Sequence, residues 1–575
     1  MSDRNLWSTT RVVLLTLILV LVLGAACNGG ATEEETTPPE EETAVVTAPP
    51  VERDDAPSAT AEDEPGTGQP EAEPAAPAGE EDASEDDSTD ADKGGGAGGG
   101  RDMLARYSRA IAENPDDPEA HYSRGLFYES KDNLEAAIAD YTRAIELDPD
   151  YAWAYNNRGD SYYSLSDYEA AIADYTRTIE IDPEYVWAYY NRGNSYDELG
   201  DYEAAIADYT RAIELDPDYA WVYYARGNSY YSLSDHEAAI ADYTRAIELD
   251  PDYAWAYNNR GTSYDDLGNY EAAIANYTRA IGIDPEYARA YYNRGNSYGD
   301  LGDYEAAIAD YTRAIEIDRE YANAYYFRGW TYVALEDWEA ARADSERYIE
   351  LEPDDPDGYE QRGYTYYRLE DWEAAQADFN RAIELDPQSA YAYFYRARTY
   401  ARLGDDQAAI DDFTRAIEIE PEDALNYRAR ADTYARLENF DAALADFTRA
   451  IELDPTSARA YNGRAWYAAL SDGDLEQALE DANRAIELEP SAGRYDTRGY
   501  VYYKRGEYEA ALADFDQAIA MGLTFSHYGR GLVYEALGEA EKALAEFELF
   551  LESAEPDDQK YIDDARERIE ALSSD

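Results

Sequence analysis

Basic side chains recur at a constant interval, interrupted once by Leu470, in the second half of an otherwise acidic chain. They are Arg368, Arg402, Arg436 and Lys504, with Arg398 and Arg428 nearby. Arginine binds carboxylates through two parallel hydrogen bonds, so a strip of such residues on one surface predicts a site for an anionic partner. The alternative is that neighbouring acids such as Glu360, Asp405 and Asp432 neutralise the strip.

Aromatic and amide side chains recur with the same period in the first half of the chain. They are Trp153, Asn156, Trp187, Tyr190, Asn194, Trp221, Tyr224, Asn228 and Trp255. Flat rings beside amides suit the backbone of an extended peptide, or the face of a sugar ring. The alternative interpretation is that each tryptophan packs on the preceding repeat and each asparagine is only solvated. Both sets are therefore candidate ligand-binding residues.

Catalysis has little support in the sequence. The three histidines, His121, His236 and His527, lie far apart, and other repeats fill their places with ordinary residues. No metal-binding, nucleotide-binding or nucleophile motif accompanies them. We expect no enzymatic activity, no metal site and no cofactor.

The charge of the chain limits its partners. Its formal net charge is -77, from 125 acidic and 48 basic residues. Such a surface repels phosphate backbones and anionic lipid heads, so the sequence argues against nucleic acid as a partner and favours cationic partners.

The elements that position these residues are repeated helical hairpins. Prolines recur with one strict period, as at Pro149, Pro183 and Pro217, and this period is typical of such arrays. In one repeat, Tyr155 and Gly159 follow helical spacing on one face of a first helix. A second helix is expected to begin at Ser166, where a capping box would join this serine to Glu169, and Pro183 prevents its continuation.

The order aromatic, Gly, Tyr, Ala, aromatic, Ala and Pro at these offsets resembles the tetratricopeptide repeat (TPR). The resemblance implies an all-α fold, a right-handed α-α superhelix (solenoid) of about 13 TPR units with a C-terminal capping helix, over residues 101–573. It also implies that the two candidate sets lie on the concave face, where this family binds extended peptides. Chaperone-docking relatives use two lysines and an asparagine there, but Tyr190 and Tyr224 occupy the first lysine position, so we do not expect that clamp.

Invariant charges are expected to serve the stack. An arginine recurs in every repeat at a fixed distance before an acid, as in Arg158 and Asp174, and this spacing predicts an ion pair between the two helices. Asn276 replaces the acid in one repeat, which predicts a weaker hairpin. Two other departures predict a longer helix at Arg319, which replaces a proline, and a local shift in superhelix pitch at the longer turn near Gly473.

The N-terminal residues resemble a bacterial lipoprotein signal. Arg4 and Arg11 precede a short apolar segment that leads to "LVLGAAC" at Cys27 and is too short to span a bilayer. The resemblance implies a signal peptide over residues 1–27 and lipidation of Cys27, with an ordinary cleaved signal or an uncleaved anchor as alternatives. Residues 28–100, rich in acidic residues, Pro, Ala and Gly, are expected to form a disordered tether.

These features together predict an exported protein, lipid-anchored at the bacterial cell envelope, either on the outer face of the cytoplasmic membrane or in the periplasm. It would act as a membrane-tethered extracytoplasmic TPR scaffold that binds extended segments of partner proteins on its concave face. The alternative is a cell-surface glycan-binding or spacer protein. The expected partners are proteins or peptides, with membrane contact only through the lipid anchor and no nucleic acid.

Overall fold

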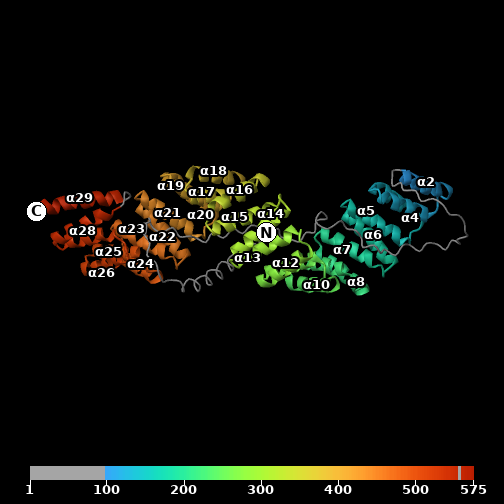
Figure 1. The fold of residues 1–575 in the computed structure, drawn as a ribbon, viewed down its shortest axis with the longest axis horizontal. Helices are drawn as coiled ribbons and strands as arrows, with labels where there is room; N and C mark the ends of the chain where they lie inside the picture. Colours follow the sequence, from blue (N-terminus) through green and yellow to red (C-terminus); the bar gives the residue numbers. More distant parts are fainter. Residues whose placement is uncertain (1–97, 555–557, 575) are drawn as a thin grey trace. The chain divides into compact units, whose positions relative to one another are not determined.

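The computed structural model describes residues 98–554 and 558–574, which form 28 helices (Figure 1). Thirteen hairpins follow one another along the chain, as the sequence predicts. Their first helices are α3 (Pro118–Glu129), α5 (Ala152–Ser164), α7 (Val186–Glu198), α9 (Ala220–Ser232), α11 (Ala254–Asp266), α13 (Ala288–Asp300), α15 (Ala322–Ala334), α17 (Pro356–Arg368), α19 (Ala390–Arg402), α21 (Ala424–Arg436), α23 (Ala458–Leu470), α25 (Ala492–Arg505) and α27 (Ser526–Ala536).

The second helices each pack against the first helix of their own hairpin and that of the next. They are α4 (Leu134–Leu147), α6 (Tyr168–Ile181), α8 (Tyr202–Leu215), α10 (His236–Leu249), α12 (Tyr270–Ile283), α14 (Tyr304–Ile317), α16 (Trp338–Leu351), α18 (Trp372–Leu385), α20 (Asp406–Ile419), α22 (Phe440–Leu453), α24 (Leu475–Leu488), α26 (Tyr508–Ala520) and α28 (Ala540–Ser553). Each hairpin is called a unit below.

Two single helices flank the thirteen units. The N-terminal α2 (Gly98–Glu113) packs on α3. The C-terminal α29 (Gln559–Ser574) packs on α28 through Ile562 and Ala565, both buried. Both helices therefore cover the ends of the array, and α29 is the expected capping helix.

The start of the second helix differs from the prediction. Asp167, not Ser166, is the N-cap of α6, and its carboxylate accepts from the Ala170 amide at 3.2 Å. Ser166 has a φ of 59° and its amide donates to the Tyr163 carbonyl at 2.8 Å, so it belongs to the end of α5. The capping box at Ser166 was wrong because the preceding turn needs that residue in a left-handed conformation.

Neither departure near the repeat prolines lengthens a helix. Beside Arg319, α14 ends at Ile317 and Asp318 is its C-cap, as in units that keep the proline. The expected longer helix is therefore wrong, because the preceding Asp already ends the helix. The extra residue near Gly473 is compensated by a shorter linker before α25, and the shift in pitch stays a prediction.

Close packing of the two helices depends on a glycine opposite an aromatic ring. A Cβ placed on Gly159 would lie 2.7 Å from Tyr175 Cε1, and Gly193 faces Tyr209 at 2.6 Å in the same way. Both rings are almost fully buried. Any side chain at these glycines would push the helices apart, so the glycine and the ring form one packing element.

The predicted ion pairs join the two helices of every hairpin except α11–α12. Arg158 Nε and Nη2 donate to the two Asp174 carboxylate oxygens at 2.7 Å each, and Nη1 donates to Thr142 of the preceding unit at 3.0 Å. The arginine thus connects three helices, and the bidentate pairing confirms the prediction.

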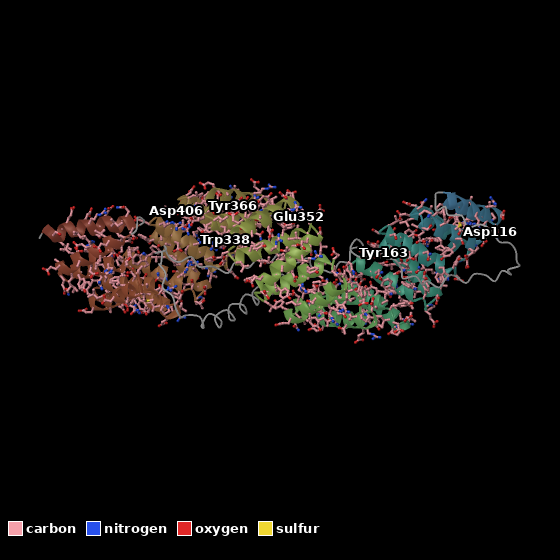
Figure 2. All side chains as sticks on the ribbon, viewed as in Figure 1. Asp116, Tyr163, Trp338, Glu352, Tyr366 and Asp406 are labelled. Carbon is pink, nitrogen blue, oxygen red and sulfur yellow. The ribbon has the colours of Figure 1, made fainter. Side chains whose placement is uncertain are left out.

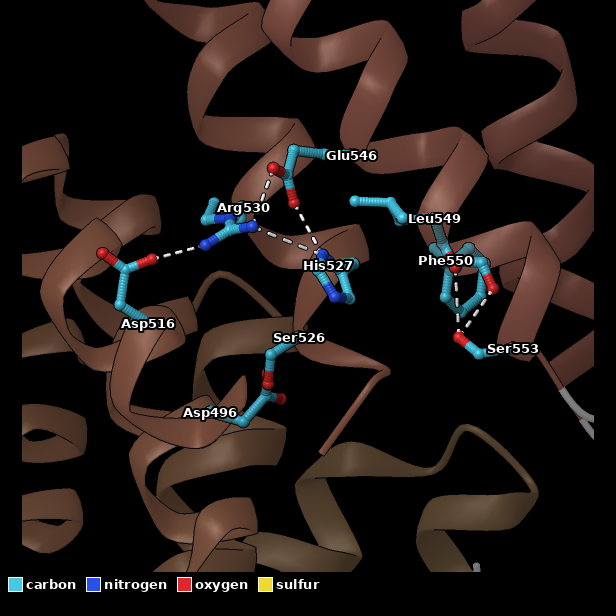
Figure 3. Close-up of polar contacts among 9 residues, drawn as sticks. All are labelled: Asp496, Asp516, Ser526, His527, Arg530, Glu546, Leu549, Phe550 and Ser553. Carbon is cyan, nitrogen blue, oxygen red and sulfur yellow. Dashed lines mark hydrogen bonds and ion pairs between the residues drawn. The ribbon is translucent and has the colours of Figure 1, made fainter. Parts of the chain in front are cut away.

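In two units another residue replaces the aspartate of this ion pair. Asn276 accepts from Arg260 Nε at 2.8 Å, and the pKa of this arginine is lowered because it is buried without a carboxylate partner. In the last unit, Glu546 accepts from Arg530 at 2.8 Å, and 2.7 Å separates its other carboxylate oxygen from His527 Nδ1 (Figure 3). His527 is therefore part of the scaffold contact of α27 with α28.

Candidate peptide-binding surface

The first helices of successive units contact one another along the array, as do α5 with α7 and α17 with α19. They form a continuous surface, which we call the first-helix surface. Both candidate sets lie on these helices, so the sequence placed them on one structural element. The candidate side chains differ in their burial and in their contacts with other residues of the array.

The tryptophans of the first half pack on one another and on tyrosines. Trp187 is 8% exposed and stacks on Trp221, with ring centroids 4.9 Å apart and an interplanar angle of 15°. Tyr190 meets the same Trp221 edge-on at 4.0 Å. The remaining two, Trp153 and Trp255, contact Tyr185 and Tyr287. Trp153, Trp187 and Trp255 therefore contact rings of the following unit, whereas Trp221 packs on rings of the preceding unit, as the alternative interpretation expects.

These contacts leave the ladder unevenly accessible. Trp153, Trp221 and Trp255 are partly exposed, whereas Trp187 and Tyr224 are buried. Three of the four tryptophans therefore keep some exposed surface, and Trp187 is the buried one.

The amides are hydrogen-bonded inside the array. Asn156 is fully buried and its Nδ2 donates to Asp160 at 2.9 Å. Asn194 and Asn228 are partly exposed, and each accepts from the tyrosine of its own second helix: Tyr209 Oη donates at 2.7 Å and Tyr243 Oη at 2.8 Å. These asparagines satisfy buried tyrosine hydroxyls, which the sequence interpretation missed.

A signal for this contact was present in the sequence. Phe379 and Phe413 replace the tyrosine in units whose first helices carry Tyr364 and Arg398 in place of the asparagine. In these two units the hydroxyl is lost together with the amide, whereas Asp160 and Thr262 replace the amide and still accept from Tyr175 and Tyr277. The pair could have been found by comparing these two positions from unit to unit.

Each basic residue at the end of a first helix contacts the preceding unit. Arg368 lies over the Trp338 ring at 4.5 Å, and Arg402 lies over Trp372 at 5.9 Å. An ion pair of 2.7 Å joins Arg436 to Asp406 (Figure 2 labels Trp338 and Asp406). Lys504 similarly pairs with Asp472 at 2.5 Å.

In the first half of the chain, different side chains make the equivalent contact between neighbouring units. Glu198, at the end of α7, accepts from Tyr163 at 3.3 Å and from Tyr168 at 3.5 Å. Carboxylate, aromatic ring and arginine therefore all serve one contact between units. The basic strip supports the stack, and its part in ligand binding stays a prediction.

Arginines also gather further along the first-helix surface. Asp432 faces Arg428, Arg436 and Arg459, and its burial raises its pKa to about 6 despite their opposing effect. Arg398, one unit earlier, lies 5.1 Å from the Tyr367 ring centre. Asp406 pairs with Arg436 and Asp423 interacts with Arg428, so three arginines meet three acids in this part of the surface.

The described residues suggest neither a metal site nor a membrane crossing. Over 98–554 and 558–574, no three or more His, Cys, Asp or Glu side chains are grouped to hold a metal ion. None of the helices in that part of the chain combines the length and apolar character needed to cross a membrane. Cys27 and the predicted signal peptide and tether lie outside the described residues.

Comparisons with solved structures identify similar helical arrays. MamA is 30% identical over 30% of this chain and 93% of its own, with a TM-score of 0.28. YrrB, titled a TPR protein with an unusual peptide-binding site, is 29% identical over 32% of this chain and 95% of its own, with a TM-score of 0.28. Yeast Tom70 is 18% identical over 78% of this chain and 99% of its own, with a TM-score of 0.34. No curated protein matches the chain.

Family profiles described as "TPR repeat" and "Tetratricopeptide repeat" match most of the chain, and none of them describes a catalytic domain. The matched residues are 128–166, 159–200, 193–234, 227–266, 262–302, 288–321, 329–393, 390–423, 428–493 and 497–558. Together with the thirteen hairpins, these matches show that the chain belongs to the tetratricopeptide repeat family and is a scaffold for protein–protein interaction.

Proposed function

We propose that this protein is a membrane-tethered extracytoplasmic scaffold that binds extended segments of partner proteins along its first-helix surface. The observation that carries the proposal is the change of side chains along one continuous surface. Partly exposed aromatic rings occupy it in the first half, and Arg428 and Arg459 occupy it further on. A segment lying across several units would meet a different set of contacts in each, which gives sequence selectivity.

The test is a library of extended peptides presented to the full chain, with binding measured for two charge-reversal variants. Arg428→Glu with Arg459→Glu changes the first-helix surface. The matched control, Arg211→Glu with Arg245→Glu, reverses two exposed arginines on second helices, each in a local ion pair with an acid on the same helix. We expect peptides with acidic residues to lose binding only in the first variant. Equal binding to both variants would contradict this placement of the site.

The glycan alternative depends on the tryptophans. Trp153 and Trp255 are the partly exposed rings outside the Trp187–Trp221 stack, so Trp153→Ala with Trp255→Ala would abolish polysaccharide binding and leave binding to the arginine region intact. The stack supports this alternative less, because it directs ring faces toward other rings.

The tether and its location form a separate part of the proposal. They rest on the resemblance of "LVLGAAC" to a lipoprotein signal, with Cys27 as the lipidated residue. Globomycin should cause the unprocessed precursor to accumulate, and Cys27→Ser should release the protein from the membrane fraction. Unchanged processing under globomycin would contradict lipidation.

A further inference from the structure

The unit of α15 and α16 has an interior unlike that of its neighbours. Ser345 is fully buried at the position where Tyr311 and Phe379 fill the hairpins on either side. The space beside Gly329 is occupied instead by Gln361 of the next unit, whose Oε1 would lie 2.6 Å from a Cβ on that glycine. Gln361 Nε2 donates to the Tyr326 carbonyl at 2.8 Å.

A large side chain is gained nearby. Tyr348 occupies the position of Ala314 and Ala382 in the adjacent units, and it is buried against Gly358, whose Cβ would lie 2.7 Å from Tyr348 Cδ1. Its hydroxyl donates to Asp355 at 2.7 Å. The exchange moves aromatic volume from inside the hairpin toward the following first helix.

The exchange brings aromatic rings together between α15, α17 and α19. The Trp330 ring lies 6.0 Å from that of Tyr364 and 6.4 Å from that of Tyr391, and Tyr391 lies 4.6 Å from Tyr395. Tyr326 contacts both Trp330 and Tyr348. Tyr391 is partly exposed, whereas the other rings are buried, so the cluster is reached from the Tyr391 side.

Two acids, Asp357 and Glu360, lie beside these rings. Glu360 is 5% exposed and accepts from Ser389 Oγ at 2.5 Å, while Asp357 is partly exposed. Among residues 98–554 and 558–574, no arginine, lysine or histidine forms an ion pair with either acid. Asp344, in the same region, has Arg328 as its partner at 2.7 Å. Glu360 therefore resembles Asp265 and Asp496, two other buried acids that accept from a serine of the next unit, and differs from them in having Asp357 close by.

Two tyrosine hydroxyls in the cluster are buried and make no hydrogen bond within the described residues. They belong to Tyr326, which is 1% exposed, and to Tyr391. Burial and the charges of Asp357 and Glu360 raise the pKa of Tyr326, and the Trp330 ring lies beside it. Burial, Tyr395 and the charge of Glu360 raise the pKa of Tyr391. A buried hydroxyl without a partner is costly, so this arrangement fits a group that enters from outside.

Charge repulsion points to the sign of that group. Burial raises the pKa of Glu360 to about 8, and repulsion from Asp355, Asp357 and Asp386 adds to this effect. The pKa of Asp357 is raised to about 6, mainly by burial and then by repulsion from Asp355 and Asp386. A cation would relieve the repulsion among these carboxylates.

We propose that Asp357, Glu360 and the Tyr326 and Tyr391 rings bind a cationic side chain, arginine or lysine, carried by the partner segment. The carboxylates would pair with the cation and the ring faces would contact it, two attractions that strengthen when water is excluded. This site rests on the proposed function and adds a chemical class to it: a partner with a basic residue that reaches the junction of α15, α17 and α19.

The probe is a decapeptide of serine and glycine with one central arginine, titrated against the full chain by saturation-transfer NMR. Matched peptides carry citrulline, the neutral analogue, or lysine at the same position. The site variant is Asp357→Asn with Glu360→Gln, which keeps shape and removes charge. The control is Glu184→Gln with Asp218→Asn, two exposed linker acids, so that both variants lose the same net charge.

We expect the dissociation constant of the arginine peptide to rise about tenfold in the site variant and to stay unchanged in the control. The citrulline peptide should bind the wild-type chain about tenfold more weakly than the arginine peptide. Equal binding of both peptides, or equal losses in both variants, would overturn the site. Binding of the lysine peptide, if it too is lost in the site variant, would extend the site to ammonium groups.

Two further measurements keep the outcome interpretable. Tyr391→Phe removes one hydroxyl without charge or volume change, and weaker arginine binding in this variant would support the site even if the acid variant misfolds. Circular dichroism checks the helical content of each variant. A library peptide that binds the wild type and the site variant equally, but fails on the Arg428→Glu and Arg459→Glu chain, would overturn the cation site and leave the scaffold function in place.

Discussion

The units α7–α8 and α15–α16 have helices of the same lengths, 13 and 14 residues, but different interiors. Tyr209 fills the first and donates to Asn194. Ser345 leaves the second without that ring, and Gln361 enters from the next unit. Both keep the arginine–aspartate pair at the same 2.7 Å closest approach. The hairpin is therefore set by its caps, glycine and ion pair, and the interior can change where the changes compensate.

The largest effect is expected from truncating the same position in the two units. Tyr209→Ala removes a nearly fully buried ring and should cost about 3–5 kcal/mol. Ser345→Ala removes one hydroxyl bonded to its own helix and should cost less than about 1 kcal/mol. Amide hydrogen exchange of α7–α8 and α15–α16 gives the local stability of each unit. Similar losses in both would contradict the compensated interior.

The second effect concerns pH and is confined to the α15–α17 region. Glu360 has a folded-state pKa of about 8 against an ordinary value of 4.5, so between these values the folded chain holds a proton that the unfolded chain has released. The stability that Glu360 contributes by holding this proton is fully present below pH 4.5 and is lost as the pH rises through about 8. Within that window the free energy of unfolding falls by roughly 1 kcal/mol per pH unit.

Glu360→Gln should remove this part of the pH dependence, because glutamine has no proton to exchange. Hydrogen exchange in α17 at pH 5, 6.5 and 8, corrected for intrinsic rates, should show protection falling with pH in the wild-type chain and a flatter profile in the variant. Glu184→Gln is the matched control, since this acid is exposed in a linker. Parallel pH profiles of all three proteins would contradict the prediction.

A smaller effect tests the exchange of large and small residues directly. Gly358→Ala places a Cβ 2.7 Å from Tyr348 Cδ1 and should cost about 1–3 kcal/mol, although alanine favours helix. In a Tyr348→Ala background the same change should cost less, because the clash with the ring is gone and only that with Ile349 Cγ1, at 2.8 Å, remains. Thermal unfolding and exchange in α16–α17 measure the coupling. Additive effects of the two substitutions would show that they do not share one space.

The sequence predicted what recurs better than what changes. The proline period, the hairpins and the pairing of Arg158 with Asp174 follow from spacing within one repeat, and the structure confirms them. The contact of Arg368 with Trp338 joins two repeats and uses residues that differ from unit to unit, so no single repeat displays it. Ser345 and Tyr348 likewise have meaning only together with Gly358 of the next unit.

The helices that carry the candidate residues were predicted from the sequence, but the accessibility of the side chains was not. Helical periodicity places Trp187 and Asn156 on the first helices, which the structure confirms, but burial depends on the neighbouring unit. Asp357 and Tyr326 were missed because acids and tyrosines are abundant in this chain, and nothing in their local spacing separates them from solvated residues. Only the absence of a partner for a buried group makes them notable.

The smallest expected effect is a difference in local stability between two neighbouring units, α9–α10 and α11–α12. Asn276 gives Arg260 one neutral acceptor, whereas Asp242 in the preceding unit accepts two hydrogen bonds from Arg226. In the wild-type chain, amides of α11–α12 should therefore exchange faster than those of α9–α10. Asn276→Asp should restore the charged pair and stabilise the unit by about 1 kcal/mol, which slows local exchange about fivefold.

The reverse change, Asp242→Asn, should speed exchange in α9–α10 by a similar or larger factor, because it leaves Arg226 buried with a neutral partner. The two substitutions exchange the same atoms in opposite directions within one protein, so solvent and net-charge effects can be separated from the contact itself. If Asn276→Asp gave no protection while Asp242→Asn lost it, the arginine of α11 would already be satisfied by Thr244, to which its Nη1 donates at 3.0 Å. The stabilising contact would then be the one between units, and the hairpin pair would serve mainly to orient the arginine toward the preceding second helix.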